Sequence, residues 1–115
     1  MRYSESLKKN DDFKAVYKDG THKADRVFVL HVKKNDLNRN RLGISVSKKV
    51  GNSVVRHRIR RLLKEAYRLN EESFKCGYDL IFSARTDAKD STYPCIESAL
   101  FRLMKRQGLL KEEEK

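Results

Sequence analysis

The residues best suited to chemistry lie between Lys48 and Arg68, in the segment KKVGNSVVRHRIRRLLKEAYR. Eight of its residues are lysine or arginine, and Glu65 is its single acid. A guanidinium group is planar and forms paired hydrogen bonds to phosphate, so arginine at this density favours a phosphate backbone as ligand. Apolar residues recur through the segment at helical spacing, which predicts a helix with one side fixed in a fold.

The predicted helix divides into an apolar arc and a cationic arc. The apolar arc is made by Val55, Ile59, Leu62, Leu63, Ala66 and Leu69. The cationic arc is made by His57, Arg60, Arg61, Lys64 and Arg68, with Arg56 and Arg58 at the borders. A solvated helix face normally mixes both signs of charge, so a role in solubility alone is the less favoured interpretation.

The loop before this helix strengthens the same hypothesis. Lys48 and Lys49 precede Gly51, and either Asn52 or Ser53 is the expected N-cap. Free backbone N–H groups at a helix N-terminus favour a bound anion. The loop and the helix together therefore predict one cationic surface.

Length and composition place this surface in a small basic protein. The chain has 115 residues, which suggests one domain, and its formal net charge is +11. Such a charge attracts polyanions, so nucleic acid is the leading partner and an anionic membrane surface is the rival. No apolar run approaches the length of a membrane span, and the N-terminus has no apolar signal core, so we expect a soluble, cytoplasmic protein.

The cysteines and histidines have no spacing typical of a metal site. Cys76 and Cys95 lie far apart and outside any CxxC pair, which favours two free thiols in a reducing compartment. His22, His31 and His57 are scattered along the chain. General acid–base work on a phosphate needs two groups placed together, so a nuclease that uses these histidines is the least favoured function.

A short first helix is expected near the N-terminus. Asn10 is a plausible N-cap, and Gly20 ends the helix. Phe13, Val16 and Tyr17 share one face at i, i+3 and i+4. From the residues alone, packing against a sheet is the favoured role of the two aromatic rings.

Two alternating segments predict neighbouring strands, Arg26 to Lys34 and Arg41 to Ser47, with a turn at Asp36 to Asn40 between them. In the first strand, the side chains that point one way are Phe28, Leu30 and Val32, and those that point the other way are Val27, Val29, His31 and Lys33. The second strand has Leu42, Ile44 and Val46 on one face and only Gly43, Ser45 and Ser47 on the other. A face that small leaves room for a ligand.

The remaining elements complete one domain. A third strand covers Tyr78 to Arg85, and a last helix begins around Ser91 and Thr92, has Pro94 in its first turn and ends at Gly108. A frayed tail is expected from about residue 109 to 115. The order helix, strand, strand, helix, strand, helix, with a further short strand near the first turn, predicts a single α+β domain over residues 1–115, an α/β sandwich.

The segment GISVSKKVGNSVVRHRIRRLLKEAYR closely resembles the signature of the bacterial ribonuclease P protein subunit. The resemblance extends to NDDFKAVYKDG, RVFVLHV, YDLIFSAR and SALFRLMKRQGLL, so it covers nearly the whole chain in the family's order. It implies a non-catalytic subunit of a ribonucleoprotein endonuclease. By this resemblance, a catalytic RNA is expected to remove the 5′ leader of precursor tRNA, and the protein is expected to bind that RNA and the leader.

The resemblance also implies which residues meet each RNA. The catalytic RNA is expected to contact Lys48, Lys49, Asn52, Arg56, His57, Arg58, Arg60, Arg61, Lys64 and Arg68. The leader is expected in a cleft formed by Phe13, Tyr17, Val29, His31, Ser45 and Ser83. The protein itself holds no catalytic residue and no cofactor in this interpretation. The holoenzyme requires Mg²⁺, and neither a membrane nor an obligatory protein partner is implied.

Three further points follow from the resemblance. His57 stands where the family usually has asparagine, and His31 stands where it often has tyrosine, although both imidazoles keep hydrogen-bonding capacity. The family fold implies a left-handed strand–helix–strand crossover through the helix that begins near Ser53, against the strong right-handed preference. The alternative function is a structural RNA-binding protein, such as a ribosomal protein of similar fold.

Overall fold

The computed structural model describes residues 4–111 of the chain. In this part of the chain the elements are β1 (Ser4–Ser6), α1 (Asn10–Asp19), β2 (Thr21–Ala24), β3 (Phe28–Lys34), β4 (Asn40–Ser45), α2 (Ser53–Asn70), the 3₁₀ turn η1 (Glu71–Ser73), β5 (Tyr78–Ala84), the 3₁₀ turn η2 (Thr86–Asp90) and α3 (Tyr93–Arg106). The predicted α+β class and the order of the main elements are confirmed.

The strands form one mixed sheet in the order β1-β4-β5-β3-β2. β4 runs parallel to β1 and to β5, whereas β3 runs antiparallel to β5 and to β2. Because α2 joins the parallel neighbours β4 and β5, the chain contains the expected strand–helix–strand crossover. Its left hand stays a prediction. β2 is the further short strand expected near the first turn.

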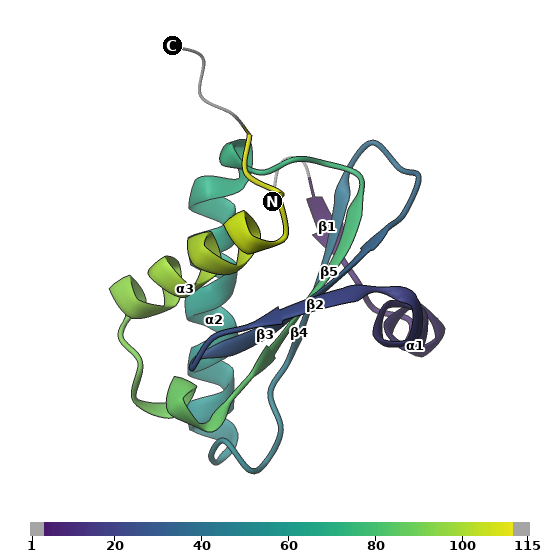
Figure 1. Ribbon diagram of the computed structural model, residues 1–115. Coiled ribbons are helices and arrows are strands. Elements are labelled where there is room, and N and C mark those ends of the chain that lie inside the picture. The colour runs from purple at the N-terminus through teal and green to yellow at the C-terminus, as the bar shows by residue number, and fades with distance from the viewer. Residues whose placement is uncertain (1–3, 112–115) are drawn as a thin grey trace.

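Helices cover the two faces of the sheet unequally. α2 and α3 lie on one face, and α1 lies on the other (Figure 1). The larger core joins Phe28, Leu30 and Val32 of β3 to the apolar sides of α2 and α3, as the alternation of β3 predicted. The smaller cluster, Leu7, Val16 and Ile81, lies with Phe13 under α1. The α1 face therefore has apolar packing over a smaller area.

Local hydrogen bonds move two predicted boundaries. The carbonyl of Lys9 accepts the N–H of Phe13, so α1 already includes Asn10, and the predicted cap at Asn10 is wrong by one residue. The carboxylate of Asp25 accepts the N–H groups of Val27 and Phe28, which makes a turn where the first strand was expected to begin.

The second strand also differs from its prediction. Asn40 belongs to β4 rather than to the preceding turn, and its amide donates to the hydroxyl of Tyr67 and to the carbonyl of Lys75. β4 ends at Ser45, two residues earlier than predicted. β1 was not predicted, and it pairs with the first half of β4.

The frayed tail begins later than expected. Leu109 is buried, and Leu110 forms an isolated bridge with Phe74. The N–H of Lys111 donates to the carbonyl of Ser73. The packed chain therefore continues through these residues, and the rest of the predicted tail, residues 112–115, lies outside the described residues.

Candidate nucleic-acid interface

The helix α2 carries the cationic residues on a firmly anchored support. The side chain of Asn52 accepts the N–H of Val55 at 3.0 Å, so Asn52, rather than Ser53, is the N-cap. Ile59, Leu63 and Ala66 are fully buried, as the apolar arc predicted. A cap of this kind stabilises a helix by about 1 kcal/mol.

One edge of the predicted apolar arc is wrong. Leu69 is 58% exposed, whereas Tyr67 is fully buried. The Tyr67 hydroxyl lies 2.9 Å from the Ser4 hydroxyl and 3.1 Å from the Asn40 amide. The tyrosine can therefore be buried, because its hydroxyl has hydrogen-bond partners inside the fold. Burial raises the pKa of Tyr67, and the hydroxyl stays protonated. α2 is thereby fixed to the strands β1 and β4.

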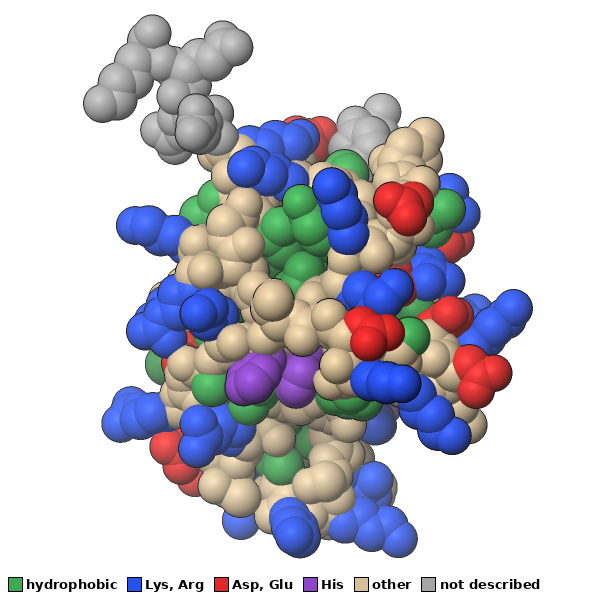
Figure 2. All heavy atoms as spheres, turned by 45° about the vertical axis from the view of Figure 1, so that its right-hand side comes forward, with side chains coloured by type: hydrophobic (Ala, Val, Ile, Leu, Met, Phe, Trp, Pro, Cys, Tyr) green, Lys and Arg blue, Asp and Glu red, His purple; other side chains and the backbone are tan. Residues whose placement is uncertain are grey.

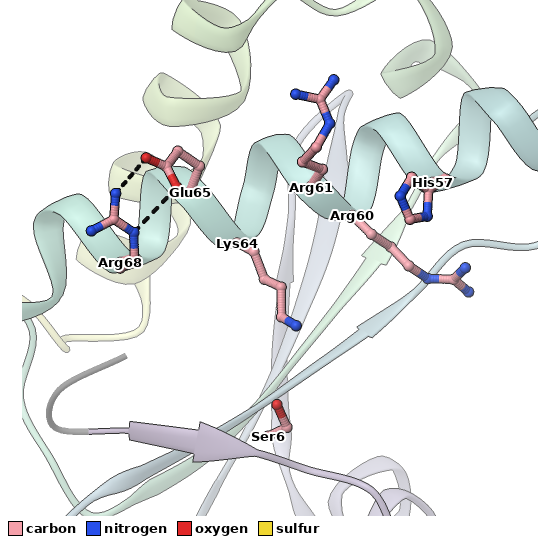
Figure 3. Close-up of a pocket in the computed structure, with 7 residues that line it drawn as sticks. All are labelled: Ser6, His57, Arg60, Arg61, Lys64, Glu65 and Arg68. Atoms are coloured by element: carbon pink, nitrogen blue, oxygen red, sulfur yellow. Dashed lines mark hydrogen bonds and ion pairs between the residues drawn. The ribbon is translucent and has the colours of Figure 1, made fainter.

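The cationic arc of α2 lines a shallow pocket, which the close-up shows (Figure 3). This pocket has a volume of about 620 Å³ and is lined by Ser6, His57, Arg60, Arg61, Lys64, Glu65 and Arg68. All five residues predicted for the cationic arc therefore lie together. We call these five residues, His57, Arg60, Arg61, Lys64 and Arg68, the basic surface. The pocket is a concave surface with positive charge in excess, which is the kind of surface that attracts a polyanion.

The cations of α2 differ in how they are held. Arg68 forms two hydrogen bonds with Glu65, and it is the one cation of α2 in an ion pair within residues 4–111. The hydrogen bond from Arg68 lowers the pKa of Glu65. Arg58 donates to the carbonyl of Ser91 at 2.8 Å, which ties α2 to the segment before α3. Arg68 and Arg58 are thus partly engaged by the protein itself.

The other predicted cations have more freedom. Lys48 and Lys49 are exposed in the turn between β4 and α2. Arg56 lies half-buried at the border of the apolar arc, as predicted, and its Nε is buried with no hydrogen-bond partner in the described structure. Arg60 and Lys64 are exposed. These side chains can reach phosphates without first breaking an internal ion pair.

On the other face of the sheet, Phe13 occupies the small strand face that the sequence indicated. A Cβ atom at Gly43 would lie 2.7 Å from Cζ of Phe13, so the missing side chain is what allows the ring to lie there. Phe13 is half-buried, so part of its ring packs against the sheet and part is open to solvent. The sequence correctly indicated an open strand face, but the protein's own helix covers part of it.

A row of rings continues from Phe13 across the sheet. Centroids of successive rings are 6.4 Å apart for Phe13 and Tyr17, 4.8 Å for Tyr17 and His31, and 5.5 Å for His31 and His22. We call Phe13, Tyr17, His31 and His22 the ring row. Histidine side chains lie next to one another on this side of the molecule, with lysines and arginines around them (Figure 2).

The remaining residues predicted for the cleft form one line beside the ring row. Val29 pairs with Ser83 across β3 and β5, and Ser83 pairs with Ser45 across β5 and β4. All three are half-buried, and the Tyr17 hydroxyl lies 3.4 Å from the Ser83 hydroxyl. The structure therefore brings all six predicted cleft residues onto the α1 side of the sheet.

A groove at the β4 edge connects the two surfaces. It has a volume of about 190 Å³, and Phe13, Gly43 and Ile44 line it together with Arg60 and Lys64. β1 pairs with β4 only as far as Leu42, so the edge of β4 beyond this point is next to the groove. The ring row and the basic surface are therefore continuous along this edge of the sheet.

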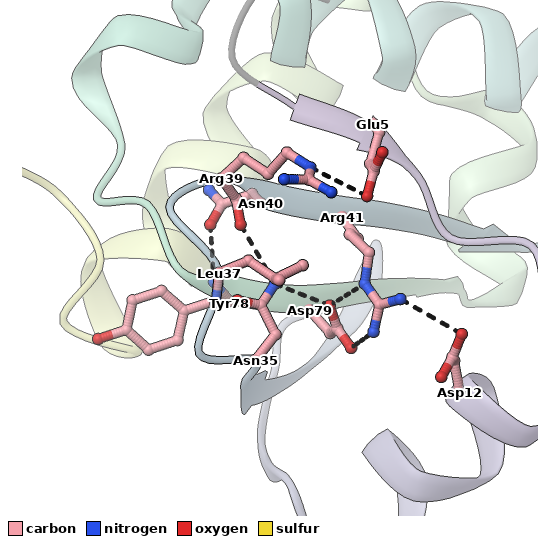
Figure 4. Close-up of polar contacts among 9 residues, drawn as sticks. All are labelled: Glu5, Asp12, Asn35, Leu37, Arg39, Asn40, Arg41, Tyr78 and Asp79. Carbon is pink, nitrogen blue, oxygen red and sulfur yellow. Dashed lines mark hydrogen bonds and ion pairs between the residues drawn. The ribbon is translucent and has the colours of Figure 1, made fainter.

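Sequence reasoning missed an ionic network that fixes α1 to the sheet (Figure 4). Arg41 donates to both carboxylate oxygens of Asp79, at 2.7 and 2.6 Å, and to the carboxylate of Asp12 in α1 at 3.3 Å. Asp79 is buried and also accepts from the Asn35 amide. The hydrogen bonds to Asp79 raise the pKa of Arg41. A charged residue, Asp79, at a buried position of the mostly apolar β5 was the signal that could have indicated this network.

The cysteines, the histidines and the acids of the described chain form no cluster suited to a metal. Within residues 4–111 no group of three or more His, Cys, Asp or Glu side chains is placed to hold a metal ion. Over the same range every helix is too short or too polar to span a bilayer. Cys76 and Cys95 are free, as predicted, and both are exposed.

Comparison with known proteins identifies the family. The family model for ribonuclease P matches residues 1–108. A ribonuclease P protein component from Alkaliphilus metalliredigens is 48% identical over 110 residues, which are 96% of this chain and 99% of that protein. Another, from Clostridium botulinum, is 52% identical over 104 residues, which are 90% of this chain and 94% of that protein.

Solved structures agree with the sequence relatives. The RNase P protein of Staphylococcus aureus superposes with a TM-score of 0.85 at 37% identity, covering 95% of this chain and 98% of that one. The RNase P protein of Thermotoga maritima gives a TM-score of 0.82 at 27% identity, covering 88% of this chain and 96% of that one. The chain therefore belongs to the ribonuclease P protein family, as a subunit of an RNA-containing enzyme of tRNA processing.

Proposed function

We propose that this protein binds the catalytic RNA of ribonuclease P with its basic surface and the 5′ leader of precursor tRNA with its ring row. The observation that carries the proposal is the separation of two chemistries on one small domain. Five basic side chains lie together on α2, and four rings lie together on the α1 side of the sheet. The two sets meet at the groove beside β4.

Each surface suits the RNA that we assign to it. Unpaired arginines and lysines such as Arg60, Arg61 and Lys64 recognise phosphates without reading sequence, which fits a large structured RNA. Exposed rings stack on unpaired bases with about 1–3 kcal/mol per base, which fits a single-stranded leader. The half-buried serines beside the rings add hydrogen-bonding groups for bases or sugars.

In this proposal the RNA carries out the cleavage, and the protein supplies binding energy and orientation. Magnesium, which we propose the holoenzyme requires, would be held by RNA phosphates rather than by a protein site. The cell compartment that fits this reaction is the cytoplasm. Family membership removes the main support for the two alternatives, a structural ribosomal protein and a protein nuclease based on histidines.

The experiment that tests the proposal is cleavage by reconstituted holoenzyme with a leader-length series. The expected result is that protein and catalytic RNA together cleave precursor tRNA at physiological magnesium, and that affinity rises with leader length. The proposal fails if the protein changes neither the rate nor the leader affinity of the RNA. RNA-free protein serves as the control and should leave the precursor intact.

A further inference from the structure

His22 is the member of the ring row that the family resemblance does not assign. It lies on β2, directly across from His31 on β3. The two imidazole planes are tilted by 33° with centroids 5.5 Å apart, so the two rings are direct neighbours in a tilted arrangement. His22 is exposed, and it forms the end of the row farthest from the groove beside α2.

We propose that His22 is a further contact for the leader, because it extends the stacking row made by Phe13, Tyr17 and His31 to the outer edge of the sheet. This inference rests on the proposed binding of the leader to the ring row. Its ligand is an unpaired RNA base that stacks on the imidazole face, or the adjoining phosphate that accepts a hydrogen bond from it.

The strand that carries His22 is held on both sides of it. The Gln107 amide donates to the carbonyl of Thr21 at 3.2 Å and to the carbonyl of Leu30 at 3.0 Å. Arg106 donates to the carbonyl of Ala24 at 2.7 Å. These side chains at the end of α3 fix β2 against the sheet, although all four residues of β2 are exposed. The strand that carries the ring is therefore placed in advance of binding, which lowers the entropic cost of contact.

The neighbouring imidazole has a protonation state that suits this arrangement. Burial, and to a lesser extent the proximity of His22, lowers the pKa of His31. His31 therefore stays neutral near neutral pH, and the pair avoids two adjacent positive charges. A neutral His31 stacks beside His22 and, at the same time, packs against the edge of Tyr17, with an angle of 80° between the planes.

The position of His22 predicts a dependence on leader length. The Phe13 end of the row adjoins Arg60 and Lys64, where we place the catalytic RNA, so leader nucleotides close to the cleavage site meet Phe13 and Tyr17 first. Nucleotides farther along the leader meet His22. Each ring takes about one base, so only a longer leader reaches the last ring.

The experiment measures the affinity of reconstituted holoenzyme for uncleavable precursor tRNAs with a series of leader lengths. His22→Ala should weaken binding by about fivefold or more, the equivalent of about 1 kcal/mol, and only for leaders longer than those at which Tyr17→Ala first has an effect. His22→Phe keeps a stacking face and should restore most of the affinity. Lys23→Ala, on the neighbouring residue, should act equally at every length because its side chain points to the other face.

Two other outcomes are informative. If His22→Ala leaves affinity unchanged at every length while Tyr17→Ala weakens it, the inference about His22 is wrong and leader binding by the other rings stands. If wild-type holoenzyme shows no gain in affinity with leader length, both the proposed function and the inference about His22 are wrong. Because His22 is exposed, the alanine variant should unfold at the wild-type temperature, which thermal denaturation checks.

Discussion

The basic surface and the ring row differ in how much of the fold each one needs. The basic surface is carried by one helix, and each of its side chains reaches solvent independently of the others. The ring row takes residues from α1, β2 and β3. Its first ring, Phe13 of α1, packs over Gly43 of β4. A lesion in the basic surface should therefore remove one contact, whereas a lesion in the sheet should disturb several rings together.

The two surfaces should also respond differently to salt. Phosphate contacts by lysine and arginine release counterions, so their contribution falls steeply as salt rises. Ring stacking involves no net charge and should be nearly insensitive to salt. The contributions of the two surfaces can therefore be separated by experiment in two ways, by the effect of a substitution on the fold and by the effect of salt on affinity.

The largest effect is expected from Arg41→Ala. The substitution leaves the buried carboxylate of Asp79 without its ion pair and frees Asp12 of α1, so we expect a loss of about 3 kcal/mol in the free energy of unfolding. Leader-dependent affinity should fall with it, because α1 carries two of the rings. Urea unfolding and precursor binding measure the two effects.

Arg39→Ala is the matched control for Arg41→Ala. Arg39 pairs with Glu5, but both side chains are nearly half-exposed, at 45% and 46%. An exposed pair contributes about 0–1 kcal/mol, so this variant should stay close to wild type. Equal destabilisation by the two substitutions would mean that the network around Asp79 does not fix α1.

Gly43→Ala tests the ring row without removing a ring. The added Cβ would lie 2.7 Å from Phe13, so the ring must move, at a cost of about 1–3 kcal/mol. We expect weaker leader binding and unchanged affinity for the catalytic RNA. Ser45→Ala, on the same strand face, is the comparison variant: it removes one hydroxyl beside the rings but adds no atoms against Phe13, so its loss of leader binding should be smaller than that of Gly43→Ala. A variant that bound the leader normally would show that the position of Phe13 is unimportant.

Arg60→Ala tests the additive behaviour of the basic surface. Affinity for the catalytic RNA should decrease, and the slope of log affinity against log salt should become shallower by about 0.7 to 0.9, the equivalent of one phosphate contact. Stability should be unchanged because Arg60 is exposed. Lys105→Ala, an exposed lysine on α3, should leave the slope as it is. An unchanged slope for Arg60→Ala would remove this residue from the phosphate contacts.

The smallest effect concerns pH and His31. Its folded-state pKa lies below the usual value of 6.5, so the unfolded chain takes up a proton first as the pH falls. The free energy of unfolding should therefore decrease slightly below pH 6.5, and His31→Phe should lack this component. Unfolding of both proteins between about pH 7.5 and about pH 5.5 measures the difference. Parallel pH profiles would contradict the assignment of a neutral, half-buried imidazole.

The sequence predicted what depends on local periodicity. The alternation of β3, a cap at Asn52 or Ser53 and the buried line of Ile59, Leu63 and Ala66 are all properties of short segments. The structure confirms them and places the cap at Asn52. The resemblance supplied the cleft residues, and the structure places them on one side of the sheet. Their contacts with RNA remain predictions.

The rest depends on register between distant strands, which periodicity does not encode. Arg41 meets Asp79 because β4 and β5 pair in that register, and His22 meets His31 because β2 folds back on β3. Tyr67 is buried because Ser4 and Asn40 supply partners for its hydroxyl. Each of these contacts joins residues that a local sequence window treats separately.

Binding of different RNAs by the two surfaces can be tested with a single ratio of affinities. The ratio of affinities for uncleavable precursor and mature tRNA should be measured for wild-type, Tyr17→Ala and Arg60→Ala holoenzymes, each assembled with saturating protein. Tyr17→Ala should lower the ratio about fivefold or more. Arg60→Ala should require more protein for assembly and leave the ratio unchanged. A ratio that depends on Arg60 and not on Tyr17 would show that the two surfaces do not divide the RNAs in this way.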